Sequence, residues 1–192
     1  MAKVEIVKPP PIAKTTPKAQ STPSNQLRET VKALLSGRYQ DNGDGTVTDE
    51  KTSLQWMRFC LGQQWYSGTC VGDAAEYTWD AAREAAETLN CHGGYAGYQD
   101  WRLPTKEELL TLVYCSNGKP KIWNDTGQSC LGDYERPTIN LTAFPNSPSS
   151  YLWSGSPNTY YSDYAWYVYF GCGNALSNHR YDYFYVRLVR NG

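Results

Sequence analysis

The sequence predicts an α+β domain in which two helices pack on a small antiparallel sheet. Two observations carry this prediction. Helix-capping signals occur in the middle of the chain, at Thr78 and at Thr105-Lys-Glu-Glu108. After Pro137 the chain consists of short aromatic and β-branched stretches separated by turn residues, which is typical of strands. The length of 192 residues allows one domain with a sizeable core.

The N-terminal segment differs in composition from the rest of the chain. Residues 1–24 are rich in Pro, Lys and Thr, which predicts a disordered, extended linker. Residues 25–37 have apolar residues at helical spacing and end at Gly37, which predicts a short helix. We expect this helix to pack on the domain; self-association is the alternative. The folded domain then spans residues 38–192.

The start of the domain carries turn signals. Asn42-Gly43 and Asp44-Gly45 are turn dipeptides between short strand-like pieces, which predicts a β-hairpin. The same run superficially resembles a calcium-binding loop. However, alignment of Gly45 with the glycine of such a loop places Gln40 at the first ligand position, so the metal-binding pattern fails. We therefore predict a hairpin and no metal site.

The two helices follow with a turn and a short strand between them. Thr78 is the predicted N-cap of an Ala-rich helix over residues 79–90. Thr105 and Glu108 form a capping box, and the helix that they open is predicted to run through Val113.

Three strands are predicted in the C-terminal part, over residues 151–154, 164–170 and 183–189. In the middle strand Trp166, Val168 and Phe170 fall on one face, whereas Tyr167 and Tyr169 fall on the other. The alternation predicts a sheet with one buried face and one exposed face that bears tyrosines.

The last 35 residues, 158–192, have an unusual composition. They contain no Lys, Glu, Gln or Met, whereas residues 1–157 contain 28 residues of these types; half of the 16 tyrosines lie in the tail. Free substitution of both adenines in an AAC or AAT codon can produce every abundant residue of the tail but none of Lys, Glu, Gln, Met or Trp. The same residues are typical of antibody combining sites, where Tyr supplies rigid contact area. The composition indicates a binding surface diversified at adenines; an ordinary Tyr-rich sheet is the alternative.

The six cysteines leave the redox compartment open. Two pairs bracket Gly-rich loops and could form disulfides in an oxidising setting, namely Cys60 with Cys70 and Cys115 with Cys130. Cys91 and Cys172 have no evident partners. Because no CxxC motif occurs, we predict no structural zinc site.

Charge and motifs argue against several classes of function. The net charge is −1 and there is no basic stripe, so we predict no nucleic-acid partner. No apolar run is long enough to insert in a membrane, and the N-terminus lacks a secretory signal; the location stays unknown, with the cytoplasm slightly favoured. His92 and His179 lie far apart, and no nucleophile elbow, phosphate loop or zinc-protease helix occurs. We therefore predict no enzyme activity, no catalytic residue and no cofactor.

A set of landmarks resembles the Lcl C-terminal domain family over residues 38–190. The most specific is Asp100-Trp-Arg-Leu-Pro-Thr105, and the others are Asp41–Asp49, Leu54–Trp56, Tyr77–Trp79, Trp153-Ser154, Ala165-Trp166 and Tyr185–Arg190. The resemblance implies a C-type lectin-like fold. Some members are carbohydrate-binding adhesin tips. Others resemble the variable proteins of diversity-generating retroelements. In these systems a reverse transcriptase miscopies template adenines, and the resulting substitutions enter the last exposed loops and strands of the protein.

The tail composition is similar to that of the second group, which implies a variable region at about residues 156–185. The fixed scaffold implied there is Trp153, Ala165, Trp166, Val168, Phe170, Arg180 and Tyr185–Arg190. The ligand-binding, variable positions implied are Asn158, Tyr160, Tyr161, Asp163, Tyr164, Tyr167, Tyr169, Gly171, Cys172, Asn174, Leu176, Ser177, Asn178, His179, Tyr181, Asp182, Tyr183 and Phe184. Calcium-dependent lectins carry a Glu-Pro-Asn motif that is absent here, and Trp123-Asn-Asp125 lies too early in the chain, so we predict no calcium-dependent sugar site.

These observations favour a non-enzymatic binding module with a hypervariable C-terminal surface. Its partner is an unidentified protein or glycan, and an oligomer is possible. The first alternative is a glycan-binding adhesin domain of fixed specificity. The second is an enzyme on the scaffold of the formylglycine-generating enzymes, for which Cys91 and Cys172 are the cysteines left to act as a pair.

Overall fold

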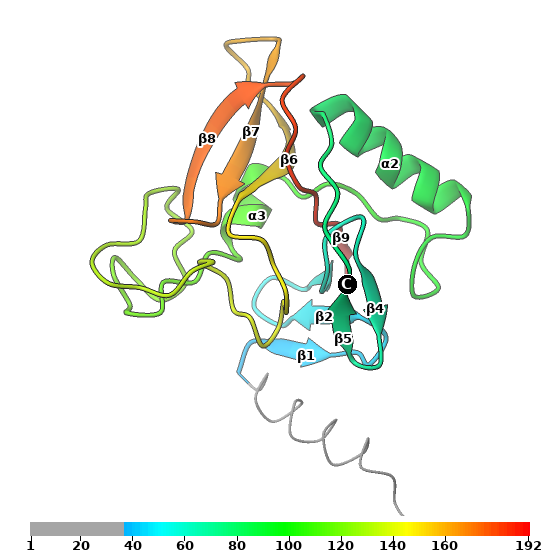
Figure 1. Ribbon diagram of the computed structural model, residues 1–192, viewed down its shortest axis with the longest axis horizontal. Coiled ribbons are helices and arrows are strands. Elements are labelled where there is room, and N and C mark those ends of the chain that lie inside the picture. The colour runs from blue at the N-terminus through cyan, green and yellow to red at the C-terminus, as the bar shows by residue number, and fades with distance from the viewer. Residues whose placement is uncertain (1–36) are drawn as a thin grey trace, which may run out of the picture.

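The computed structural model describes residues 37–192, so the linker and nearly all of the helix predicted before Arg38 lie outside the described residues. The described residues form two helices and three small antiparallel sheets, with more strand than helix (Figure 1). The mixed α and β composition agrees with the prediction. The strands, however, are divided among three sheets rather than gathered in one.

The first sheet joins the two ends of the domain. Its strands are β1 (Tyr39–Asp41), β2 (Thr46–Asp49), β3 (Leu54–Met57) and β9 (Val189–Asn191), in the order β1-β2-β3-β9. The hairpin predicted between β1 and β2 is confirmed, with Tyr39 paired to Asp49. The carboxylates of Asp41 and Asp44 accept hydrogen bonds from the amides of Gly43 and Thr46. They serve the turn itself, as Asx side chains commonly do.

The second sheet is the hairpin of β4 (Gln64–Tyr66) and β5 (Thr69–Val71), and the two helices follow it. Helix α2 (Trp79–Cys91) begins at the predicted cap, where the Thr78 side chain accepts from the Ala81 amide. Helix α3 (Lys106–Leu110) has the predicted capping box, with both reciprocal hydrogen bonds present.

Helix α3 is shorter than predicted. After Leu110 the chain tightens into i→i+3 hydrogen bonds, and the Val113 amide bonds to the Leu110 carbonyl. Val113 then bridges to Ile139, and Leu112 and Val113 are fully buried. Leu112 and Val113, which continue the apolar spacing of a helix in the sequence, are therefore buried in the core from a turn instead.

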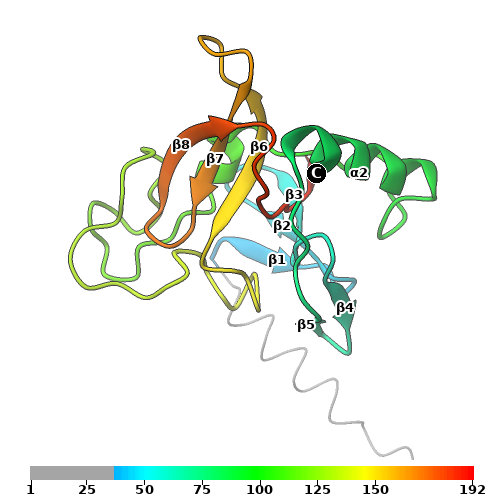
Figure 2. The same ribbon diagram turned by 45° about the horizontal axis from the view of Figure 1, so that its top comes forward.

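The third sheet contains β6 (Tyr151–Pro157), β7 (Tyr164–Tyr169) and β8 (Asn174–His179), in the order β6-β7-β8 (Figure 2). Strands near the predicted 151–154 and 164–170 are present. The strand predicted over residues 183–189 is wrong: Phe184 and Tyr185 make only isolated bridges, to Tyr77 and Leu152, and β9 begins at Val189. The third strand is instead β8, which lies within the predicted variable region and for which no strand was expected.

Both faces of the third sheet are covered. Leu152 and Val168 belong to one buried cluster, together with residues of and after α3. Trp153, Ala165 and Tyr167 belong to a second cluster, which includes Trp79 of α2 and Phe184. This corrects the expectation of a single buried face, because the chain after β8 returns across the face that bears Tyr167.

Four of the cysteines form either a disulfide or buried free thiols. Cys115 and Cys130 form a disulfide, whereas Cys60 and Cys70 are separate, buried thiols rather than the bonded pair considered from their spacing. Burial raises the pKa of both thiols, and the nearby Arg187 guanidinium opposes that rise. The guanidinium is fully buried, donates to the Met57 carbonyl at 2.8 Å and lies 3.6 Å from the Cys60 sulfur.

Candidate functional site

Four exposed tyrosines gather at one end of the third sheet. Tyr160 and Tyr161 lie in the loop from β6 to β7, and Tyr181 and Tyr183 lie just after β8; their exposed fractions are 90%, 62%, 64% and 64%. The loop projects beyond the sheet, at the end where β8 finishes (Figure 2). We call these four residues the tyrosine surface.

The loop that carries Tyr160 and Tyr161 is held by Asn158. The Asn158 Oδ1 atom accepts hydrogen bonds from the amides of Tyr160 at 2.8 Å and Tyr161 at 3.2 Å. Its Nδ2 atom donates to Ser177 Oγ of β8 at 3.0 Å. Asn158 is buried, with 8% of its surface exposed. This predicted ligand-binding residue therefore supports the loop from inside.

A chain of stacked rings connects the loop to β8. The Tyr164 hydroxyl lies 2.7 Å from His179 Nε2, and the His179 ring stacks on Tyr181 with centroids 4.7 Å apart. The centroids of the Tyr161 and Tyr164 rings are 5.6 Å apart. His179 Nδ1 lies 3.3 Å from Asp163 Oδ2, close enough for an ion pair when the ring is protonated but without hydrogen-bond geometry. The contacts hold Tyr161 and Tyr181 in one fixed arrangement.

The electrostatic environment of this ring chain is acidic. Burial raises the pKa of the Tyr164 hydroxyl, and the carboxylates of Asp163 and Asp182 raise it further. Arg180, the cation in the same segment, is directed inward: its guanidinium lies 4.2 Å from the Trp79 ring centroid. The Arg180 amide also donates to the Asp163 carbonyl. The tyrosine surface is therefore aromatic and bordered by carboxylates.

Two other predicted ligand-binding residues lie in the core. Tyr167 and Phe184 are each 8% exposed, and their rings are 4.9 Å apart. Tyr167 also packs on Tyr151 at 5.3 Å and on Trp153 at 6.2 Å. We call Tyr151, Trp153, Tyr167, Tyr169 and Phe184 the aromatic layer. The prediction that Tyr167 faces solvent is wrong because the chain around Phe184 covers it.

The turn from β7 to β8 holds a further group of predicted positions, at the opposite end of the sheet. A Cβ atom on Gly171 would lie 2.2 Å from the Tyr169 ring, so a side chain there requires that ring to move. The Cys172 carbonyl accepts from the Cys130 amide at 2.7 Å, and its sulfur lies 3.2 Å from Asn174 Oδ1. The predicted positions thus divide between two ends of the sheet, with Leu176, Ser177 and Asn178 along β8 between them.

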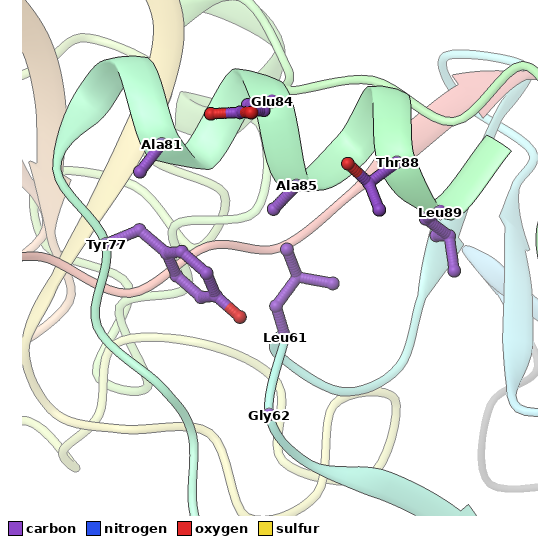
Figure 3. Close-up of a pocket in the computed structure, with 8 residues that line it drawn as sticks. All are labelled: Leu61, Gly62, Tyr77, Ala81, Glu84, Ala85, Thr88 and Leu89. Carbon is purple, nitrogen blue, oxygen red and sulfur yellow. The ribbon is translucent and has the colours of Figure 1, made fainter. Parts of the chain in front are cut away.

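A shallow groove of about 460 Å³ lies against α2, apart from the tyrosine surface. Figure 3 shows apolar side chains of α2 facing the loop after β3, with the Tyr77 ring between them. Its lining residues are Leu61, Gly62, Tyr77, Ala81, Glu84, Ala85, Thr88 and Leu89. The titratable side chains of this lining are the Glu84 carboxylate and the Tyr77 phenol, and the rest is mostly apolar.

The two cysteines considered for an enzyme lie in different parts of the fold. Cys91 ends α2 and is exposed, whereas Cys172 is held in the β7–β8 turn against Ser129 and Asn174 (Figure 1). Within residues 37–192, no three His, Cys, Asp or Glu side chains come together as a group that could hold a metal ion. The same range contains no helix with the length and apolar character needed to cross a membrane.

The sequence matches the model of one known family. The Lcl C-terminal domain model matches residues 45–190, which is most of the chain, and the chain belongs to this family. No curated protein matches the chain. Membership indicates a binding module of the adhesin type, in a family that is generally non-catalytic.

Proposed function

We propose that this protein is a non-enzymatic ligand-binding module that recognises its target through the tyrosine surface, displayed on a C-type lectin-like scaffold and diversified by a retroelement. One observation carries the proposal: four exposed tyrosines are gathered in a segment without Lys, Glu, Gln or Met. Such a surface combines large apolar area with hydroxyl groups and few long, flexible side chains.

Recognition by this surface has a low entropic cost. Each immobilised, rotamer-rich side chain costs a binding surface about 0.5–1.5 kcal/mol, whereas Tyr has only two χ angles to fix. Asn158 holds the loop, and the His179–Tyr181 stack fixes the far side. The backbone at Tyr160 and Tyr161 and the ring of Tyr181 are therefore preorganised, and the identities of the exposed residues set the target.

Diversification fits the exposure of this segment. Solvent-facing residues such as Tyr160, Asp163 and Tyr183 can change with little effect on folding, because surface substitutions usually change stability by about 0.5 kcal/mol or less. Gly171 and Tyr167 are different, because each is confined by packing. We expect variation to concentrate in the first group.

The nucleotide sequence around the gene tests the diversification. A near-copy of the segment encoding residues 156–185, differing at its adenines and lying close to a reverse-transcriptase gene, is the expected finding. Absence of such a copy would leave the alternative, a domain of fixed specificity for a glycan.

Substitution tests the surface itself. The triple variant Tyr160→Ala, Tyr161→Ala, Tyr181→Ala should lose at least ~100-fold in affinity for any ligand found on glycan and protein arrays, because aromatic anchors dominate binding energy. Tyr66→Ala is the matched control, since Tyr66 is 69% exposed but lies on β4. Equal binding by the triple variant and the control would place the ligand site elsewhere.

A further inference from the structure

The outer edge of β8 is a second feature of the same region. Strand β8 is the terminal strand of the third sheet and pairs on one side with β7 (Figure 1). On the other side the Ala175 amide donates to the Gly127 carbonyl at 3.0 Å, so Ala175 faces away from β7. Backbone direction alternates along a strand, and therefore the amides of Ser177 and His179 also face outward.

These outward groups are unpaired. Among residues 37–192, no hydrogen bond engages the Ser177 amide, the Ser177 carbonyl or the His179 amide outside the β7–β8 ladder. Together they form a short row of donors and an acceptor, at the end of β8 that adjoins the tyrosine surface. Such a row is a template for another extended chain.

Two other sheet edges are covered, those of β6 in the third sheet and of β9 in the first sheet. The amide of Trp153 in β6 donates to the Tyr185 carbonyl, and Val189 of β9 exchanges hydrogen bonds with Arg102. The edge of β8 also lacks the usual protection, because Asn174–His179 contains no Lys, Pro or carboxylate. Leu176 of this strand is 48% exposed. A free, unprotected edge beside a recognition surface is a place for a partner.

The charge around the edge restricts the partner. The Asp163 side chain is 65% exposed beside His179, and Asp182 follows shortly after β8. The Arg180 guanidinium packs on the Trp79 ring and does not form an ion pair with either carboxylate. A segment added beside β8 would therefore gain from a Lys or Arg side chain at the His179 end.

We propose that the ligand of this surface is an extended polypeptide segment that adds a strand to the free edge of β8 at Ser177 and His179 and places a basic side chain near Asp163. This inference rests on the proposed binding function and names its ligand class. Main-chain hydrogen bonds would supply affinity that survives a change of side chains, and the flanking tyrosines would supply specificity. In a surface whose side chains vary while its backbone stays fixed, the backbone can keep supplying affinity while the side chains change the specificity.

The test begins with a library of random 12-residue peptides, selected on the full chain, with a glycan array run in parallel. The strongest peptide is then resynthesised with single N-methyl groups along its backbone. We expect N-methylation to weaken binding at alternate positions, because one side of an added strand bonds to the edge. Exchange of the Ser177 and His179 amides, measured by NMR, should be fast in the free protein and slowed at least ~10-fold by the peptide.

Two variants separate the edge from the side chains. Ser177→Pro removes the outward amide without breaking the β7 ladder, since proline is tolerated where a strand amide faces solvent. Ser177→Ala is the matched control, because it removes the hydroxyl contacted by Asn158 but keeps the amide. We expect Ser177→Pro to bind the peptide at least ~10-fold more weakly than Ser177→Ala does.

The outcomes are distinct. Peptide binding that is lost in the tyrosine variant but unaffected by Ser177→Pro and by N-methylation would overturn the edge inference and leave the proposed function intact. A selection that returns no peptide, with or without glycan binding, would overturn it as well. Protection of the Ser177 amide that rises with protein concentration alone would assign the edge to a second copy of the chain instead.

Discussion

The aromatic layer and the tyrosine surface both contain tyrosines in or next to the third sheet, yet the rest of the chain covers the two groups to different extents. Tyr167 is 8% exposed and packed among other rings, whereas Tyr160 is 90% exposed. The difference arises from the rest of the chain. The segment around Phe184 covers the first group, and the projecting loop carries the second away from any cover. Tyrosine content alone therefore does not identify a binding surface.

The sharpest test of this comparison substitutes one tyrosine from each group. Tyr167→Ala should lower the free energy of unfolding by about 3–5 kcal/mol, because it removes a ring packed against Tyr151, Trp153 and Phe184. Tyr160→Ala should change it by about 0.5 kcal/mol or less. Urea denaturation of both variants measures the difference. Similar losses at the two positions would mean that the distinction between the groups is wrong.

The second prediction concerns the residue that holds the exposed group in place. Asn158→Ala should cost about 1–3 kcal/mol in stability, because it removes three partly buried hydrogen bonds, two from loop amides and one to Ser177. It should also weaken ligand binding by loosening Tyr160 and Tyr161. Thermal unfolding and affinity, measured on the same variant, check both effects.

Asn158→Asp is the control for that variant. It keeps an oxygen that accepts from the two loop amides, replaces the donor to Ser177 with an oxygen that can accept from the Ser177 hydroxyl, and adds a negative charge at a buried position. We expect an intermediate loss of stability and near-normal binding. Binding lost equally in both variants would show that Asn158 contacts the ligand rather than the loop.

Local signals in the sequence predicted local structure well. The caps at Thr78 and Thr105 and the hairpin at residues 42–45 depend on side chains that bond to backbone a few residues away. Strand β8 was missed because Asn174–His179 has no alternation of apolar and polar residues. Its extended form results from the turn at Gly173, whose φ of +86° suits glycine, and from pairing with β7.

The site was predicted less completely than the fold. Composition located the exposed tyrosines of the tail, because it distinguishes the segment as a whole. It could not separate Tyr167 or Phe184 from them, because their burial depends on a chain crossing that no local pattern encodes. Asn158 was assigned to the ligand for the same reason, and only its three hydrogen bonds reveal a supporting role. The spacing of Cys60 and Cys70 likewise suggested a disulfide across a loop. It did not indicate that both are buried as free thiols, with Cys60 close to Arg187.

The third prediction concerns the contact of the start of α3 with β6 and β7. The Lys106 amide bonds to Ser156 Oγ at 2.9 Å, and the Lys106 ammonium lies 4.4 Å from the Trp166 ring centroid. Glu108 stabilises this helix start through the capping box and through two hydrogen bonds with Arg102. Burial on its own raises the pKa of Glu108, but the bonds from Arg102 and the Thr105 amide outweigh it and hold the pKa below its usual value.

The sign of the pH dependence follows from that direction. Because the folded-state pKa of Glu108 lies below the unfolded value of about 4.5, its stabilisation is complete above pH 4.5 and is lost as the pH falls through the folded-state pKa. Glu108→Gln should therefore lower the free energy of unfolding by about 1 kcal/mol at pH 7, and the difference from the wild type should shrink below pH 4.5. Glu87→Gln is the control, since Glu87 is an exposed carboxylate of α2. The prediction would be wrong if the difference in free energy of unfolding between Glu108→Gln and the wild type stayed constant across the acid range, or if Glu87→Gln had an equal effect. Either result would mean that the Glu108 charge does not stabilise the start of α3.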